Sequence, residues 1–245
     1  MKPGQFIFNG VDSESIKSFI QGRPIIQTPR RKRELKSAYG RSGFVIFDEE
    51  ESYENTDMDL VLYSLGDDVN TASKNRELLF NLFDNVGYSD FIPYFDPGKI
   101  YRVMVRDYID FDSKYYMGEG QSLNVRLTVH PWKLYVGNFK KTLTASGSIV
   151  NPYSRKSKPL FKITGNGDIT LKVNGIDFLI KGVNGHIWID SEQMFAYRDV
   201  SGVITNENTK IHTRNYPILK PGTNTISWVG SITNIEIEPR WRTLV

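Results

Sequence analysis

The sequence predicts a mainly β protein of two domains, and three observations support this fold class. Aromatic residues make up 13% of the 245 residues, including 13 Tyr and 14 Phe, and such side chains pack well on pleated strands. Short apolar runs separated by turn-forming residues recur through the carboxyl-terminal half. The length suffices for two domains of ordinary size, each with its own core. We therefore expect one domain at residues 1–137 and another at residues 138–245.

The first domain is expected to be a β-sandwich. It contains runs of apolar and β-branched residues of strand length, at 5–8, 43–47, 58–65, 100–108 and 122–129. The last of these runs alternates regularly, so that Leu123, Val125 and Leu127 share one face. This alternation is typical of a strand with one buried face.

One segment of the first half has the periodicity of an amphipathic helix. Apolar side chains recur at helical spacing within residues 74–86, at Leu78, Leu79, Leu82, Phe83 and Val86. Ser73 stands at the position of an N-cap, and Gly87 stands where a left-handed residue commonly ends a helix. A single helix packed on a sheet is the simplest arrangement of these elements.

The second half shows no helical periodicity and predicts a β-sandwich or jelly roll. Its strand-like runs are 160–164, 169–174, 177–181, 186–190, 194–197, 225–229 and 232–238. Between them lie turn signals at 165–168, 174–175, 184–185 and 220–222, two of which are Asn-Gly pairs that favour tight hairpins. The preceding segment, 132–159, is rich in Ser, Gly, Asn, Pro and basic residues, and we interpret it as the junction between the domains.

Composition excludes several classes of function. The sequence has no cysteine, which excludes disulfides, thiolate nucleophiles and Cys-ligated zinc. The formal net charge of +3 is too small to indicate nucleic-acid binding. The first ten residues lack the apolar stretch of a signal peptide, and no apolar run approaches the roughly 20 residues needed to span a bilayer.

The residues that could carry chemistry do not form a recognisable site. The histidines, His130, His186 and His212, lie in separate elements without a second ligand at metal-binding spacing. Asp190 and Glu192 stand two residues apart, hence on one face of an extended segment, and such a pair could serve a glycoside hydrolase. Nothing marks either carboxyl group as a buried acid, and a polar strand end that leads into a hairpin accounts for both.

The acidic clusters also lack the pattern of a binding site. A run at Asp48, Glu49, Glu50 and Glu51, followed by Glu54, Asp57 and Asp59, lacks the order of ligands found in calcium-binding loops, and so do Asp107, Asp110 and Asp112. Gly165 and Gly167 lie between two strands rather than before a helix, so they predict a turn and not a phosphate-binding loop. We therefore predict no catalytic residue, no cofactor and no metal.

The strongest charge feature suggests an interface between subunits. A basic run consists of Arg30, Arg31, Lys32 and Arg33, and the acidic run at Asp48, Glu49, Glu50 and Glu51 follows a short distance downstream. We expect residues 24–56 to form a projecting hairpin with one basic arm and an acidic far end. Such an arm is suited to lie against a copy of itself on a neighbouring subunit, head to tail in a ring. A solvated hairpin is the alternative.

The order of the carboxyl-terminal segments resembles the distal tail protein of long, non-contractile phage tails. The similar segments are 151–175, 187–197, 216–228 and 235–241. They contain a Ser-Lys-Pro start, an Ile-Asp-x-Glu hairpin, a Pro-x-Leu-x-Pro-Gly-x-Asn stretch and a Glu-Pro-Arg-Trp ending. The first half is similar too, with its Phe-x-Phe-Asn-Gly start, charged hairpin after Pro24, single helix and the sequence GEGQSLNVRLTVHPW.

This resemblance implies a structural role at the tail tip of a virion. Members of the family form hexameric rings through their amino-terminal domains, and their carboxyl-terminal domains are galectin-like β-sandwiches. The ring connects the tail tube protein to the tail-associated fibre or lysin protein and often to receptor-binding proteins, while genomic DNA passes through its channel. It implies assembly in the host cytoplasm and no membrane insertion. The chain lacks the large loop insertions that carry an extra carbohydrate-binding module in some relatives.

An alternative function is direct carbohydrate binding by the second domain. Binding of host-surface glycans needs an exposed aromatic platform, for which Trp188 and Trp228 are candidates. Tryptophans on alternating strands belong more often to the core, so we expect both to be buried.

Overall fold

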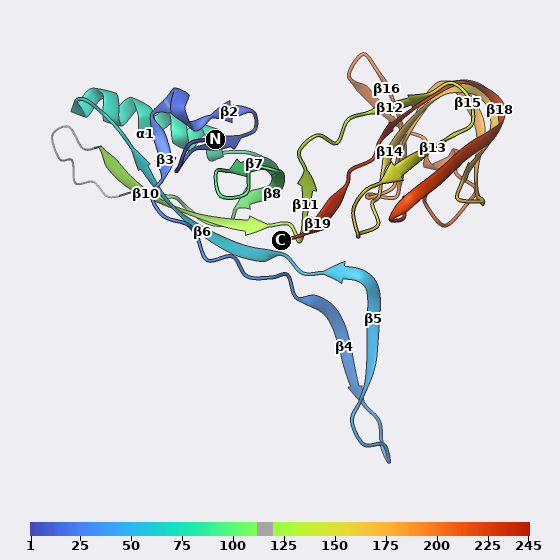
Figure 1. Cartoon of the computed structure of the whole chain (residues 1–245), viewed down its shortest axis with the longest axis horizontal. Coiled ribbons are helices and arrows are strands. Elements are labelled where there is room, and N and C mark those ends of the chain that lie inside the picture. Colours follow the sequence, from blue (N-terminus) through green and yellow to red (C-terminus); the bar gives the residue numbers. More distant parts are fainter. Residues whose placement is uncertain (112–119) are drawn as a thin grey trace. The chain divides into compact units, whose positions relative to one another are not determined.

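Antiparallel sheets make up most of the chain, as the sequence predicts (Figure 1). The computed structural model describes residues 1–111 and 120–245, and for residues 48–50 it describes the backbone alone. The chain divides into two compact units, one formed by residues 1–136 with 244–245 and the other by residues 137–243. None of the helices described is long and apolar enough to cross a membrane.

The first unit is built on one large antiparallel sheet. Its main path runs β2-β1-β7-β8-β10-β6-β3. These strands are β1 (Phe6–Phe8), β2 (Val11–Asp12), β3 (Ser18–Ile20), β6 (Thr56–Ser64), β7 (Ser89–Pro93), β8 (Lys99–Val105) and β10 (Gln121–Val129). A 3-10 turn, η1 (Ser13–Ile16), follows β2, while β9 (Asp110–Phe111) pairs with β10 and β11 (Trp132–Tyr135) pairs with β8.

The longest pairing described in this sheet joins β10 to β6. It runs without a register shift from Gln121 opposite Ser64 to Val129 opposite Thr56. Both strands alternate between buried and less buried residues, so one face of the sheet forms the core. The predicted alternation of Leu123, Val125 and Leu127 is therefore confirmed.

The helix α1 (Val69–Phe83) begins earlier than predicted. Its N-cap is Asp68, not Ser73, and the Asp68 carboxylate accepts hydrogen bonds from the Thr71 backbone N–H and hydroxyl, each at 2.9 Å. The first of these bonds satisfies a backbone N–H of the first turn, which Ser73, inside the helix, cannot reach. The helix also ends before the predicted Val86, so Gly87 is not its terminating residue.

The buried face of α1 is narrower than the predicted stripe. Leu79 and Phe83 are buried, as expected, whereas Leu78 is 42% exposed and Val86 lies beyond the helix in solvent. The Phe83 ring meets that of Phe8 edge to face, with centroids 4.6 Å apart. The helix thereby attaches to the first strand of the sheet through aromatic packing.

A separate two-stranded sheet forms the predicted hairpin. It consists of β4 (Arg31–Ser37) and β5 (Phe44–Tyr53) (Figure 1). We call this hairpin the arm. It lies within the range 24–56 that the sequence predicts.

The second unit is a seven-stranded antiparallel sheet with its own core. Its path is β12-β18-β14-β15-β16-β17, and β13 pairs with β18. The strands are β12 (Lys141–Leu143), β13 (Gly147–Asn151), β14 (Leu160–Val173), β15 (Ile176–Asp190), β16 (Phe195–Val200), β17 (Val203–Asn206) and β18 (Gly222–Glu238). A 3-10 turn, η2 (Asn208–Lys210), follows β17. The terminal strand of the chain, β19 (Arg242–Leu244), belongs to the ten-stranded sheet.

Three long strands replace pairs of short strands that the sequence predicts. β14, β15 and β18 each join two predicted runs into one strand of 14, 15 and 17 residues. The turns predicted at 165–168 and 184–185 are therefore wrong, because both segments lie inside paired strands. The turn at Asn174 and Gly175 is confirmed, since both residues have positive φ and join β14 to β15.

Gly165 allows β14 to continue past the predicted turn while it stays paired with β18. The register of β14 against β18 shifts between Thr164 and Gly165, and a Cβ at Gly165 would lie only 2.2 Å from the Ser231 carbonyl oxygen. Glycine thus permits a close backbone approach at a bulge, where the sheet bends without ending.

The two adjacent leucines of α1 provide a test of its packing. Leu79 is fully buried and Leu78 is 42% exposed. We expect Leu79→Ala to lower the free energy of unfolding of the first unit by roughly 2–5 kcal/mol, because the substitution leaves a cavity in the core. The same change at Leu78 should cost less than about 1 kcal/mol. Urea unfolding of both variants would measure this difference, and equal losses would contradict the helix orientation.

Candidate functional site

The charged runs of the arm lie beside each other rather than at opposite ends. In the hairpin register Arg31 stands opposite Tyr53 and Arg33 opposite Asp48. The sequence predicted an acidic run at the far end of the hairpin. This prediction is wrong, because Asp48 stands opposite Arg33 near the base. Strand pairing brings the runs together because the turn lies midway between them, at residues 38–43. The side chains of Asp48, Glu49 and Glu50 lie outside the described residues.

Side-chain and backbone contacts hold the two strands of the arm together at its base. The Arg31 guanidinium donates to the Tyr53 hydroxyl at 3.2 Å and lies over the Tyr53 ring. That ring meets the buried Trp132 indole edge to face, with centroids 5.4 Å apart. The Glu54 backbone N–H donates to the Arg30 carbonyl at 2.8 Å. Arg30, Lys32 and Arg33 are exposed, whereas Arg31 and Glu51 are half-buried.

The arm also carries an apolar face that charge patterning alone does not indicate. Leu35 and Ile46 are cross-strand partners, and Phe44 lies on the same face two residues from Ile46. These side chains are 54%, 59% and 62% exposed, respectively. A two-stranded hairpin has no second layer to cover such a face, so this surface is suited to contact another protein surface.

Asp190 belongs to a structural ion-pair network. It is buried, accepts hydrogen bonds from the backbone N–H groups of Glu192 and Gln193, and pairs with Arg240 Nη1 at 3.0 Å. Arg240 also lies 4.0 Å from the Glu192 carboxylate and 3.7 Å from that of Glu238. These ion pairs and hydrogen bonds fit a structural role for the carboxylates, whereas a glycoside hydrolase needs a carboxyl group that is free to donate a proton to its substrate.

The segments behind the family resemblance meet one another in the second unit. Ser157 and Leu219 exchange both backbone hydrogen bonds, at 2.9 and 3.1 Å. The fully buried Asn224 closes the Pro-Gly loop, since its amide donates to the Lys220 and Gly222 carbonyls at 2.8 and 3.0 Å. Together with the Asp190–Arg240 pair, these contacts show that the quoted motifs stabilise the fold.

The histidines and acidic residues that the structure describes do not converge on a metal site. His186 Nε2 lies 2.8 Å from the Asp199 carbonyl, the His130 ring accepts from Arg102 at 2.9 Å, and His212 is exposed. Across residues 1–111 and 120–245, no group of three or more metal-ligating side chains converges.

The aspartates predicted not to bind calcium have other partners. Asp57 pairs with Arg106 at 2.6 Å and Asp110 with Arg126 at 3.2 Å. Arg106 also lies 3.6 Å from Asp107. Asp112 lies outside the described residues. These described aspartates are explained as members of ion pairs on the sheet.

Trp188 lies on the outer face of its sheet rather than in the core, so its predicted burial is wrong. Its neighbours in sequence, Ile187 and Ile189, point into the core, while Trp188 is half-buried between its cross-strand partners Lys162 and Tyr197. The Tyr197 ring is stacked at 6.0 Å and 3°, and the Lys162 ammonium lies 5.3 Å from the indole centroid. Burial raises the pKa of the Tyr197 hydroxyl, which keeps it neutral. This packing leaves little aromatic face for a sugar.

Trp228 differs from Trp188. It stands opposite the buried Leu171, which places it on the core side of β18, but the indole is only half-buried. The predicted core location is thus only partly correct for Trp228. Neither tryptophan forms an open platform of the kind that the carbohydrate-binding alternative requires.

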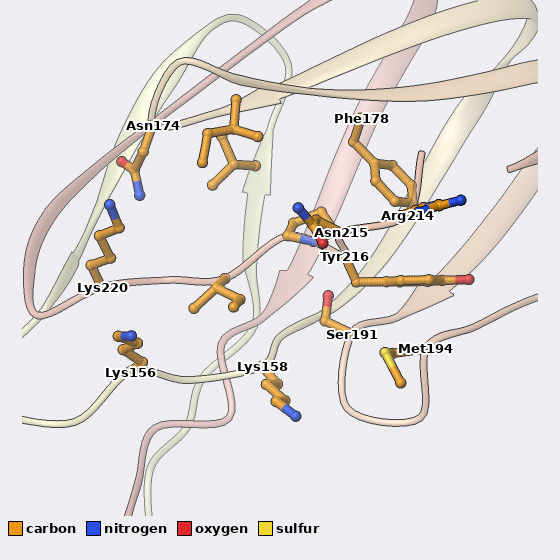
Figure 2. A pocket seen from close by; sticks show the side chains of 14 residues that line it. Lys156, Lys158, Asn174, Phe178, Ser191, Met194, Arg214, Asn215, Tyr216 and Lys220 are labelled. Atoms are coloured by element: carbon orange, nitrogen blue, oxygen red, sulfur yellow. The ribbon is translucent and has the colours of Figure 1, made fainter. Parts of the chain in front are cut away.

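A groove in the second unit escaped the sequence analysis. It has a volume of about 330 Å³ (Figure 2). Its lining comes from four separate segments, at 156–158, 173–178, 191–194 and 214–220. No local pattern reveals such a groove, because its residues come together only when the strands pair. The one signal in the sequence was that these segments overlap in part with those that carry the family resemblance.

Solved structures of two phages have the same fold over the whole chain. The Dit protein of phage SPP1, described as a paradigm of the hub adsorption apparatus in phages that infect Gram-positive bacteria, matches with a TM-score of 0.66. The identity is 13%, and the match covers 99% of this chain and 100% of that one. A chain of the phage P2 baseplate in its activated conformation with calcium matches with a TM-score of 0.58 at 9% identity, covering 97% and 98% of the two chains.

The corresponding P2 baseplate structure with strontium gives a TM-score of 0.60 at 8% identity and covers 100% of this chain and 99% of that one. No family model matches the sequence, and no curated protein matches it significantly. The resemblance predicted from the carboxyl-terminal motifs is therefore confirmed at the level of the fold.

The Arg240 network predicts a stability effect confined to the second unit. Replacing Arg240 with Ala leaves the Asp190 carboxylate, whose side chain is 8% exposed, without its cation. We expect a loss of about 2–4 kcal/mol, because an uncompensated buried charge is costly. Lys172→Ala, which removes an ion pair with Asp177 whose side chains are 45% and 50% exposed, should change stability by less than about 1 kcal/mol. Thermal unfolding would compare them, and a neutral Arg240→Ala would refute the structural role.

Proposed function

We propose that this chain is a structural hub of a phage tail tip. In this role it forms a hexameric ring that connects the tail tube to the tail-associated fibre or lysin protein and to receptor-binding proteins. The observation that carries the proposal is the likeness of fold to the SPP1 Dit protein, which spans both units and 99% of the chain. The site of action is the tail tip of the virion, and genomic DNA passes through the channel without being read.

The proposed role is non-enzymatic. The best catalytic candidate, Asp190, is bound by Arg240 and by two backbone N–H groups, which suits a structural carboxylate. No cofactor or metal is required for the role. The sheets supply rigid surfaces, and a closed ring covers strand edges that would otherwise stay open to unwanted pairing.

The arm is proposed to contact the neighbouring subunit. The interface includes the residues suggested by sequence, which are Arg30, Arg31, Lys32, Arg33, Asp48, Glu49, Glu50 and Glu51. The hairpin register brings the two charged runs together, with Arg33 opposite Asp48. We expect the exposed apolar face at Leu35, Phe44 and Ile46 to contribute more to the binding free energy of the interface than the charged residues do. The charged residues then set the orientation of the arm on its neighbour.

Ring formation is the direct test of the hub. Negative-stain imaging of the purified full chain should show sixfold rings with a central hole, and light scattering should give a mass six times that of the 28.1 kDa chain. A chain that stays monomeric at high concentration would argue strongly against the proposal. Binding of the purified chain to host glycans, in the absence of rings, would instead favour the carbohydrate-binding alternative.

Two sets of substitutions test the arm. Phe44→Ser with Ile46→Ser should shift the ring toward smaller species, because the double variant removes apolar contact without altering charge. Reversal of Arg31 and Arg33 to Glu should also weaken the ring. The matched control is Val200→Ser with Val203→Ser, a cross-strand pair 51% and 67% exposed at the end of another hairpin. Light scattering reports the mass, and an unchanged ring in both arm variants would exclude the arm from the interface.

A further inference from the structure

The groove of the second unit combines an apolar interior with a cationic rim. Figure 2 shows the side chains that line it. The interior is formed by aliphatic, aromatic and proline side chains, namely Val173, Ile176, Phe178, Met194, Tyr216, Pro217 and Ile218. The Phe178 and Tyr216 rings contact each other, with centroids 5.3 Å apart, and form one wall. An apolar side chain of a ligand would find a preformed cavity here.

Part of this apolar surface is open to solvent. Ile176 is 59% exposed, Met194 61% and Ile218 40%. Three large apolar side chains around one cavity differ from the isolated exposed residues that are common on protein surfaces. Their arrangement indicates a surface that a partner covers.

The charged residues of the rim are all cations. Lys156, Lys158, Arg214 and Lys220 line the groove, and its lining contains no Asp or Glu. Figure 2 shows Lys156 and Lys220 on one side of the groove, Lys158 at its lower edge and Arg214 on the other side near Phe178. Lys158, Arg214 and Lys220 form no ion pair with the residues that the structure describes. Burial raises the pKa of the Tyr216 hydroxyl, so this residue stays neutral and adds no negative charge to the groove.

One buried polar group also lacks a partner at the groove. Ser191 is 2% exposed and lines the cavity, and its hydroxyl makes no hydrogen bond within the described residues. A buried hydroxyl without a partner is costly, and a ligand group that reaches it would recover a hydrogen bond. This observation is independent of the charge of the rim.

We propose that this groove is a docking site for an extended acidic peptide segment of a partner protein, anchored by an apolar side chain. The apolar side chain enters the cavity beside Phe178 and Tyr216, and its flanking carboxylates meet Lys158, Arg214 and Lys220. The inference deepens the proposed hub function by naming the chemistry of one partner. The apolar lining favours a peptide over a sugar-phosphate polymer, which has polar groups along its whole length and no side chain to fill such a cavity.

The test uses the full chain and a short fluorescein-labelled peptide with one phenylalanine flanked on both sides by glutamates. Two control peptides replace the phenylalanine with serine or the glutamates with lysines. Fluorescence anisotropy should show the glutamate–phenylalanine peptide binding at least about tenfold more tightly than either control, and its affinity should fall as salt is raised.

Variants of the chain locate the binding site. Lys158→Glu with Arg214→Glu should reduce the affinity about tenfold or more, and Ile176→Ser should also reduce it. The matched control is Lys140→Glu with Lys181→Glu, which changes the charge equally at two exposed lysines outside the groove. Thermal unfolding of each variant verifies that the second unit remains folded.

Several outcomes would overturn the inference. Equal binding of the serine control would reduce the groove to a nonspecific cationic surface, and full affinity in Lys158→Glu with Arg214→Glu would place the peptide elsewhere. Binding of phosphatidylglycerol vesicles, but of no peptide, would assign the site to lipid. A fall in oligomer mass for the same variant would assign it to a second copy of this chain. Rings that persist without peptide binding would refute the docking site alone, whereas absent rings would refute the hub.

Discussion

The architecture of the second unit depends on the close approach of two strand backbones at glycine. A Cβ at Gly165 would lie 2.2 Å from the Ser231 carbonyl oxygen, and a Cβ at Gly230 would lie 2.6 Å from the Asp168 carbonyl oxygen. β14 and β18 therefore approach each other where only glycine fits, and the register shifts there. Because the strands bend instead of ending, Leu160 stays paired with Asp190 on one side and with Glu238 on the other. The ion-pair network of Arg240 forms at that end.

Strand pairing between distant segments also explains which parts of the fold could be predicted from the sequence. The alternation of buried residues and the Asn174-Gly175 turn were recognisable because both depend on local periodicity and positive φ. Asn184-Gly185 has the same two residues, and Gly185 also has positive φ, but Asn166 and Gly165 pair with it across the strand. Whether an Asn-Gly pair forms a turn or lies within a strand is decided by its long-range partner, which the local sequence does not contain.

Prediction of the helix and of the functional surfaces had similar limits. The buried face of α1 was correct at Leu79, while its start was missed because Asp68 and Ser73 are both good caps and only the folded backbone selects one. Charge runs revealed the arm but not its exposed apolar face, since apolar residues in a strand give no sign of whether a second layer covers them. The groove was invisible to sequence reasoning because its segments are distant along the chain.

The contacts of the candidate residues favour the proposed connector over the enzyme and lectin alternatives. The carboxylates that could act in catalysis are bound, as Asp190 is by Arg240, and the outer tryptophan Trp188 has its ring flanked by Lys162 and Tyr197. By contrast, the apolar face of the arm and the cationic, apolar groove of the second unit are open to solvent. The free energy falls when another protein surface covers exposed apolar side chains. One such surface in each unit is what a protein needs if it joins copies of itself through one unit and holds a different partner with the other.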